Sequence, residues 1–269
     1  KNISLKPGHR TDVKVVVEGS TDGAQPPPET SPSYAELLKL YPDAKLGMPT
    51  AEEKKELGEL WPEVPAEENA AFYFMKAGAL INTDDAPPES LCSGEQPSEI
   101  DTGRLRAWVN SNQNALALLQ QGLRKESCQI PFFVGATEGE VNSGLHFVGS
   151  LRQLARLTCD AGLSAELNDR PEDAARWYLH CMRLGARIGE RGALIHSLVG
   201  LATLDVGRAH LDRLIDDADL SNDVLSRTLK QCAALEMGIE DILAVVSAEG
   251  AYSRQTMATM PPNIWTADG

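Results

Sequence analysis

The spacing of apolar residues predicts that the second half of the chain is almost continuously helical. Between residues 145 and 167, apolar or small side chains recur every three or four positions, as they do on one face of an α-helix. The same spacing predicts further helices, which begin near residues 171, 193, 221 and 239. The helix from 193 to 215 is apolar nearly all round at its start, which is typical of a central buried helix.

Local signals support the boundaries of these helices. The run 168–170 is polar and predicts a turn, and Pro171 suits the first position of the helix that follows. In the first half, the sequences 33–36 and 50–53 match the capping box of a helix start. The short helices that follow should end near Pro42 and Pro62. Longer helices are expected at about 66–81 and 104–125, with loops at 83–102 and 127–143.

Proline divides the chain into regions. Nine of the 16 prolines fall in residues 1–65, whereas residues 144–258 contain only Pro171. We therefore expect a flexible or linker segment at 1–33, which holds a β-prone run at 13–17, and short helices at 34–65. A helical domain should occupy 66–258, and a tail 259–269. The predicted fold class is all-α: an irregular helical bundle or a short tetratricopeptide-like α-solenoid with a Pro-rich N-terminal stem.

The composition excludes several classes of partner. Of the 269 residues, 42% are apolar and 24% are charged, as in ordinary folded proteins, but aromatic residues make up only 5%. The net charge of −14 repels nucleic acid and anionic lipid. No stretch reaches the roughly 18 apolar residues that a membrane span requires. We therefore expect neither nucleic-acid binding nor a membrane span within this chain, and a protein partner instead.

The five cysteines predict neither a disulfide framework nor a zinc site. Their number is odd and they never form a C-x-x-C pair. A single disulfide between Cys92 and Cys128, both in loop-like regions, is left open. The chain starts with Lys1 rather than Met, so we expect that a leader or an anchor was removed, or that the chain was trimmed.

The segment 158–186 resembles one tetratricopeptide unit. Small residues and one aromatic residue occupy the positions at which the two antiparallel helices of such a unit pack closely: Gly162, Ala174, Tyr178 and Cys181. Other positions depart from the pattern, because Ala186 stands where proline is usual. No second copy with a period of about 34 residues is present. The resemblance implies a helical hairpin rather than a regular array.

The chain also resembles a group of uncharacterised bacterial all-helical proteins that have a leader or anchor and a Pro-rich stem. The residues that carry this resemblance are the run Glu68-Asn69-Ala70-Ala71-Phe72-Tyr73 and the arginines between Arg152 and Arg213. The resemblance implies an exported or membrane-tethered, periplasmic-type location; without it, the cytoplasm is the expected location. It implies no activity.

The well-known catalytic and metal-binding signatures are absent. The sequence contains no H-E-x-x-H, P-loop, G-x-G-x-x-G or G-x-S-x-G motif. Two histidines, His196 and His210, fall within about 40° of the same face of one predicted helix. Together with His180 they could form a metal or acid–base cluster, although buried structural histidines are the simpler interpretation. We therefore expect no metal and no cofactor.

One enzymatic pattern stands as an alternative hypothesis. The acids Asp84, Asp85 and Glu89 precede a second motif, Asn222-Asp223-x-x-Ser226-x-x-x-Lys230. The arrangement resembles the two magnesium motifs of class I terpenoid synthases, which hold Mg²⁺ against a substrate diphosphate, and Arg176 would then sense that diphosphate. Lys230 replaces the last acidic ligand, and two prolines interrupt the helix that should present the first motif. This hypothesis requires both motifs to face one cavity.

Arginine replaces lysine in the C-terminal half, where residues 144–269 contain 11 Arg and one Lys. Most of these arginines recur at spacings that favour helix surfaces, where they would form weak exposed ion pairs. The alternative is a surface that grips acidic groups through paired hydrogen bonds. We therefore expect a non-catalytic interaction or scaffold protein, rather than an enzyme. Its candidate contact residues are Arg176, Trp177, Tyr178, Arg183 and Arg187.

Overall fold

The structure, a computed structural model, describes residues 32–42, 45–47, 51–58, 64–84, 86–87, 101–134, 143–218, 220–235, 243, 245–247, 249–250 and 253. Its elements are α1 (Tyr34–Leu40), β1 (Lys45–Gly47), α2 (Ala51–Leu57), a 3₁₀ turn (Ala66–Glu68), α3 (Ala70–Ala79), α4 (Thr102–Ser111), α5 (Gln113–Leu123), β2 (Phe132–Val134), α6 (Ser143–Glu166), α7 (Pro171–Glu190), α8 (Leu194–Asp217) and α9 (Asn222–Ala233). The prediction of an all-α fold is confirmed. The run 13–17 lies outside the described residues.

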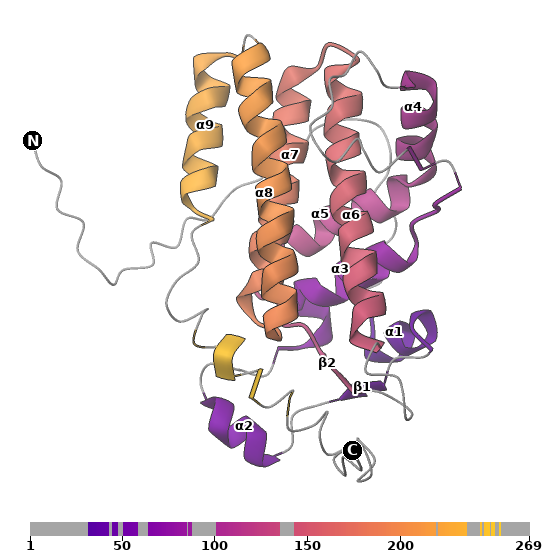
Figure 1. Ribbon diagram of the computed structural model, residues 1–269, viewed down its shortest axis with the longest axis vertical. Helices are drawn as coiled ribbons and strands as arrows, with labels where there is room; N and C mark the ends of the chain where they lie inside the picture. Colours follow the sequence, from indigo (N-terminus) through magenta and orange to yellow (C-terminus); the bar gives the residue numbers. More distant parts are fainter. Residues whose placement is uncertain are drawn as a thin grey trace, which may run out of the picture.

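The long helices α6, α7 and α8 lie side by side and form the centre of the molecule (Figure 1). On one side α9 packs against α7, and on the other side α4 packs against α6. The pair α3 and α5 contacts α6 and α7, and α1 packs on α3. A single cluster of buried apolar side chains connects these layers, from Leu37 of α1 to Val224 of α9.

Two short strands join distant parts of the chain. β1 and β2 pair in antiparallel register, with Lys45 opposite Val134 and Gly47 opposite Phe132. The hydrophobic pattern did not predict this pairing, because three residues are too few to display a period of two. The pairing holds the segment before α2 against the segment before α6.

The start of α1 follows the predicted cap. The backbone amide of Glu36 donates to the hydroxyl of Ser33 at 3.2 Å, which satisfies one free amide of the first turn. Glu36 also pairs with Lys76 of α3 at 2.8 Å. The second expected cap, at Thr50, lies outside the described residues, and so does Pro62.

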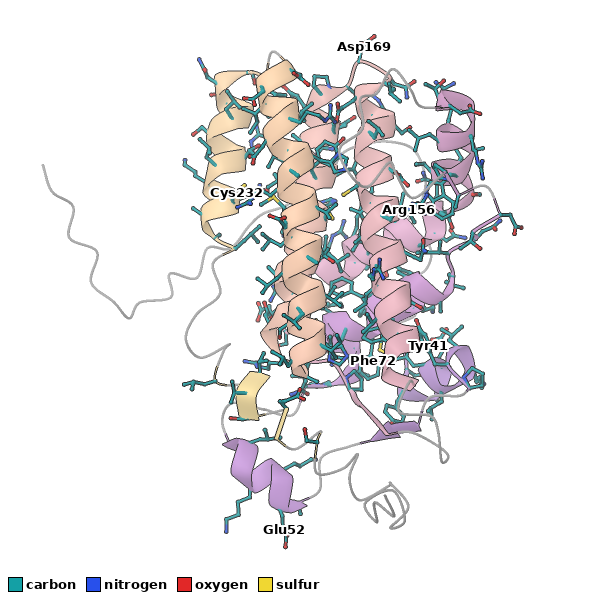
Figure 2. The ribbon with its side chains drawn as sticks, in the orientation of Figure 1. Tyr41, Glu52, Phe72, Arg156, Asp169 and Cys232 are labelled. Carbon is teal, nitrogen blue, oxygen red and sulfur yellow. The ribbon has the colours of Figure 1, made fainter. Side chains whose placement is uncertain are left out.

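The α6–α7 hairpin matches the sequence prediction closely. Its turn places Asp169 at the tip, with a φ of 54°, and Pro171 begins α7 (Figure 2). Gly162 of α6 faces the ring of Tyr178 on α7, so any side chain at Gly162 would collide with that ring. The hairpin implied by the tetratricopeptide resemblance is therefore present, while membership of that repeat family stays a prediction.

The helix expected at 66–81 corresponds to α3, which is shorter than predicted and begins at Ala70. Asn69 has an extended backbone, and its side chain accepts a hydrogen bond from the amide of Ala71 at 3.1 Å. The same side chain donates to the carbonyl of Gln129 at 2.7 Å and accepts from its amide at 2.9 Å. Asn69 thus starts α3 and ties this point to the segment after α5.

The helix expected at 104–125 is two helices, α4 and α5, which meet at Asn112. The Asn112 side chain is buried and donates to the carbonyls of Asn82 and Trp108, at 3.0 and 2.9 Å. It also accepts from the amide of Asn82 at 2.7 Å. These bonds join the junction to the segment after α3, and apolar periodicity alone gives no sign of them.

The helices α7 and α8 approach each other through glycines. A Cβ added at Gly185 would lie 2.5 Å from the carbonyl oxygen of Gly200, and a Cβ added at Gly200 would lie 2.6 Å from the carbonyl oxygen of Gly185. A Cβ added at Gly207 of α8 would lie 2.9 Å from the backbone nitrogen of Met182. Because no side chains separate the helices here, their backbones are in direct contact.

The expectation that α8 is buried all round at its start is wrong. Its buried positions there are His196, Ser197, Gly200 and Thr203, which are polar or small. Its large apolar side chains at the same end point to solvent. The close contact with α7 explains this orientation, because the inner face of α8 has no room for leucine.

The four described cysteines carry free thiols, and Cys128 among them is fully buried. The disulfide with Cys92 that the sequence left open is therefore not formed at Cys128, and Cys92 itself lies outside the described residues. Within the described residues, every helix is too short or too polar to cross a membrane.

We predict that Gly185→Ala lowers the free energy of unfolding by about 1–3 kcal/mol, because its methyl group would meet backbone atoms that cannot turn away. Gly149→Ala is the matched control: Gly149 lies in α6 with no atom within 4 Å of an added Cβ. This change should raise the stability by about 0.5–1 kcal/mol. Urea unfolding of both variants measures the difference. Equal effects would contradict the close contact of α7 and α8.

Candidate protein-binding surface

Tyr178, one of the expected contact residues, is fully buried. Its hydroxyl donates to the carboxylate of Glu166, and its ring stacks on that of His210 at 5.1 Å between centroids. Burial, and then the charge of Glu166, raise the pKa of Tyr178. Arg213 of α8 also pairs with Glu166, at 2.7 Å. Tyr178 therefore joins α6, α7 and α8 and cannot reach a partner.

Arg183 and Arg187, two further expected contacts, bind the end of α5. Arg183 donates to the carbonyl of Leu123 at 3.1 Å, while Arg187 donates to the carbonyls of Lys125 and Glu126 at 3.0 and 2.9 Å. The last carbonyls of a helix lack partners within it and carry partial negative charge. Arg183 thus caps the last carbonyl of α5, and Arg187 binds two carbonyls just beyond it, so both arginines tie α7 to the end of α5.

Arg176 is the most exposed of the expected contact residues. It pairs with Asp173 one turn away, at 3.1 Å. Trp177 beside it is half-buried at the edge of the core, and its ring stands edge-on to His180 at 5.3 Å. Of the predicted contact set, Arg176 is exposed, Trp177, Arg183 and Arg187 are partly exposed, and Tyr178 is buried.

The three histidines do not form a cluster. His180 contacts Trp177, His196 contacts the ring of Phe147 on α6 at 6.0 Å, and His210 lies on Tyr178. Among the described residues, no group of three or more potential ligands is arranged to hold a metal ion. The simpler interpretation, that these histidines are structural, agrees with their burial.

Burial keeps these histidines uncharged. It lowers the pKa of His180 to about 3, helped by the positive charge of Arg183, and the pKa values of His196 and His210 to about 4. Among the described residues, one buried ring nitrogen of His180 and both buried ring nitrogens of His210 have no hydrogen-bond partner. Protonation of these rings would place a charge where the protein offers no compensation.

A buried polar contact between α4 and α6 was missed by the sequence analysis. Trp108 of α4 donates from Nε1 to the Asp160 carboxylate at 3.0 Å, and the guanidinium of Arg156 lies 3.8 Å from the same oxygen. The Arg156 side chain leaves α6 on the side that faces α4 (Figure 2). The sequence had placed Arg156 among surface arginines, but it is buried. Burial raises the pKa of Asp160 to about 6, against the opposing effects of Arg156 and Trp108.

The described residues of the two acidic motifs of the magnesium hypothesis are not brought together, while Asp85 and Glu89 lie outside the described residues. Asp84 lies in an exposed turn whose amide donates to Asn82, and Asn82 is bound to Asn112 at the junction of α4 and α5. Asn222 and Ser226 are exposed on α9. Helices α4 and α9 lie at opposite sides of the molecule (Figure 1). The described residues of the two motifs therefore share no cavity.

The first turns of α8 carry the most prominent apolar surface of the described residues. Four large side chains there are between 39% and 54% exposed: Leu194, Ile195, Leu198 and Leu201. Their spacing of three and four residues places them side by side on the helix. We call these four residues the apolar patch of α8. Contiguous apolar surface of this kind marks interaction sites in soluble proteins.

The same side of α8 becomes acidic toward its C-terminus. At 100° per residue, Asp205, Arg208, Asp212 and Asp216 fall within about 40° of the direction of Leu194, and all four are exposed. We call them the acidic half of this face. The outer face of α8 is thus divided along its length, with leucines at one end and carboxylates at the other.

Glu249, in a segment near the C-terminus, caps the start of α8. The backbone amide of Leu194 donates to the carboxylate of Glu249 at 2.8 Å. A carboxylate is favourable at this position because a helix N-terminus carries unpaired amides and partial positive charge. Nearby in sequence, Val245 is buried while Leu243 and Val246 are exposed. This segment therefore holds the end of α8 at which the apolar patch begins.

Comparison with known proteins adds no relative. Neither protein-family models, nor curated proteins, nor solved structures gave a match to this chain.

We predict that Arg187→Met lowers the free energy of unfolding by about 1–3 kcal/mol, because the carbonyls of Lys125 and Glu126, just beyond α5, lose charged donors. The control is Arg176→Met, which removes one exposed ion pair and should change stability by less than about 0.5 kcal/mol. Thermal and urea unfolding measure both. Similar losses for the two variants would show that Arg187 is no cap.

We predict that the protein loses stability as the pH falls below 6.5, because the unfolded chain binds protons at histidines that stay neutral when folded. Asp160 has the opposite effect on stability between about pH 6 and 4, because the folded protein binds a proton there more readily than the unfolded chain. The effect of this one carboxyl group is smaller than that of the three histidines. In His180→Leu the slope should be shallower by up to about 1.4 kcal/mol per pH unit. Urea unfolding from pH 7 to 4.5 measures the slope. An unchanged slope would mean that His180 is protonated in the folded protein.

Proposed function

We propose that this chain is a non-catalytic protein-interaction module that binds a protein partner through the outer face of α8. The observation that carries the proposal is the apolar patch of α8, in which four large side chains gather within three turns of one helix. Burying such side chains against a partner is favourable by about 25 cal/mol for each Å² of apolar surface.

The orientation of α8 strengthens this proposal. Leucines usually face the core of a bundle, whereas the core side of the first turns of α8 is made of His196, Ser197, Gly200 and Thr203. The close contact of Gly185 with Gly200 fixes that orientation, so α8 cannot turn to bury its leucines. A surface that is both apolar and rigid suits binding, because little conformational freedom is lost on association.

The buried polar groups support a structural role for the rest of the helical core. Asp160 joins α6 to α4, Glu166 joins α6 to α7 and α8, and Arg187 joins α7 to the end of α5. Each of these contacts fixes one helix against another. They hold the face of α8 in place rather than converging on a common reaction centre.

The protein partner and the cellular location are proposed on different grounds. A protein partner is supported by the patch, in place of the arginine surface expected from the sequence. An exported or membrane-tethered location rests on the sequence resemblance alone and stays a prediction.

We predict that Leu198→Gln/Leu201→Gln abolishes partner binding and leaves the fold intact, since both side chains are about half exposed. The matched control is Leu229→Gln, which replaces a leucine on α9 that is somewhat more exposed and does not belong to the patch. Tagged wild-type and variant proteins are used to recover partners from native extract and solubilised membranes, and each candidate is then tested as purified protein by calorimetry.

A partner that binds wild type and Leu229→Gln with similar affinity, but the double variant at least tenfold more weakly, is the expected result. Circular dichroism and thermal unfolding confirm that the variants are folded. Binding that survives the double substitution would contradict the proposed role of α8.

A further inference from the structure

The outer face of α8 changes from apolar to acidic along its length, and this change restricts what the face can bind. The apolar patch occupies the first turns, and the acidic half follows on the same line. From Leu194 to Asp216 the face extends over about 33 Å, at 1.5 Å per residue. An occupant that covers the whole face must therefore be elongated, with an apolar end and an end that tolerates carboxylates.

The negative charge of this face is not neutralised by its single arginine. Arg208 pairs with Asp205 at 2.7 Å, so the net charge of the acidic half lies with Asp212 and Asp216. The chain as a whole carries −14. An acidic occupant would repel these carboxylates, and a neutral occupant would leave them without a counter-charge. Lysine or arginine side chains of the occupant would pair with them.

A second copy of this chain is a poor occupant. In parallel alignment, the acidic halves of two α8 helices would lie against each other. In antiparallel alignment over the full length, Leu194 would face Asp216, so leucine would be buried against carboxylate. The face is complementary to itself only over the few residues of the patch, which is less surface than a stable interface needs. An anionic membrane is disfavoured by the same negative charge.

A helix fits the shape of this face better than a strand or a loop. Leu194, Leu198 and Leu201 follow the spacing of four and three residues that forms a ridge on a helix surface. A second helix packs on such a ridge with anchors at matching intervals, which is a recurrent mode of peptide recognition. Its residues opposite Asp212 and Asp216 would be basic.

Accordingly, we infer that the partner of this module presents an amphipathic helix, apolar in one half and basic in the other, which lies along the outer face of α8. The inference rests on the proposed binding role of that face and specifies its partner. The leucines supply affinity that is insensitive to salt. The acids select the charge and the register of the partner helix.

The test uses two synthetic helical peptides of about 22 residues, the length that spans 33 Å. Both carry leucines at helical spacing in one half. In the other half the Lys probe has lysines on the same face, and the Glu probe has glutamates. Fluorescence anisotropy gives the dissociation constant of each probe for the wild type and the variants, at low and at high salt.

The Lys probe should bind the wild type about tenfold more tightly than the Glu probe at low salt, and the difference should shrink at high salt as screening increases. In Asp212→Lys/Asp216→Lys the preference should reverse. Leu198→Gln/Leu201→Gln should lose both probes, and Leu229→Gln should behave as the wild type. Circular dichroism checks that all variants are folded.

Equal binding of the two probes, or no reversal in the charge variant, would overturn the inferred partner chemistry. So would concentration-dependent self-association in sedimentation experiments that the double leucine variant abolishes, because a second copy would then be the occupant. The proposed function fails separately, when a purified native partner binds the double leucine variant as well as the wild type.

Discussion

The contact between Gly185 of α7 and Gly200 of α8 is the constraint on which the rest of the structure depends. It places two backbones against each other, so that the buried positions in the first turns of α8 are small or polar. The large apolar side chains at the same end of α8 must then face outward. One packing requirement thus determines both the centre of the bundle and the character of its surface.

Buried polar side chains complete the alignment of the helices. Asp160 binds Trp108 across the interface of α4 and α6, and Glu166 accepts from Tyr178 while it pairs with Arg213. Each contact is directional, unlike apolar packing, and so fixes the rotation of one helix relative to the next. Some of the arginines of α7 serve the same purpose. Arg183 donates to the last carbonyl of α5, and Arg187 donates to two carbonyls just beyond it.

The long helices could be predicted from the sequence because their causes are local. The boundaries of α6 and α7, the turn at Asp169 and the role of Pro171 all follow from periodicity and from capping rules. The interruptions at Asn69 and Asn112 could not be predicted, since the groups that hold them are Gln129 and Asn82, far away in sequence. An asparagine within a helical pattern gives no indication of its tertiary partner.

The sequence by itself determined an acidic all-α protein and the apolar character of the first turns of α8. Only the tertiary structure decided which sides of the helices are covered. Periodicity identifies an apolar face but not its neighbour, so the first turns of α8 were expected to be buried all round and Tyr178 was expected among the contact residues. The structure instead exposes the large apolar side chains of the patch and buries Tyr178. The physical reason is steric: the glycines of α7 and α8 select the closest approach, and the leucines occupy the side that this approach leaves open.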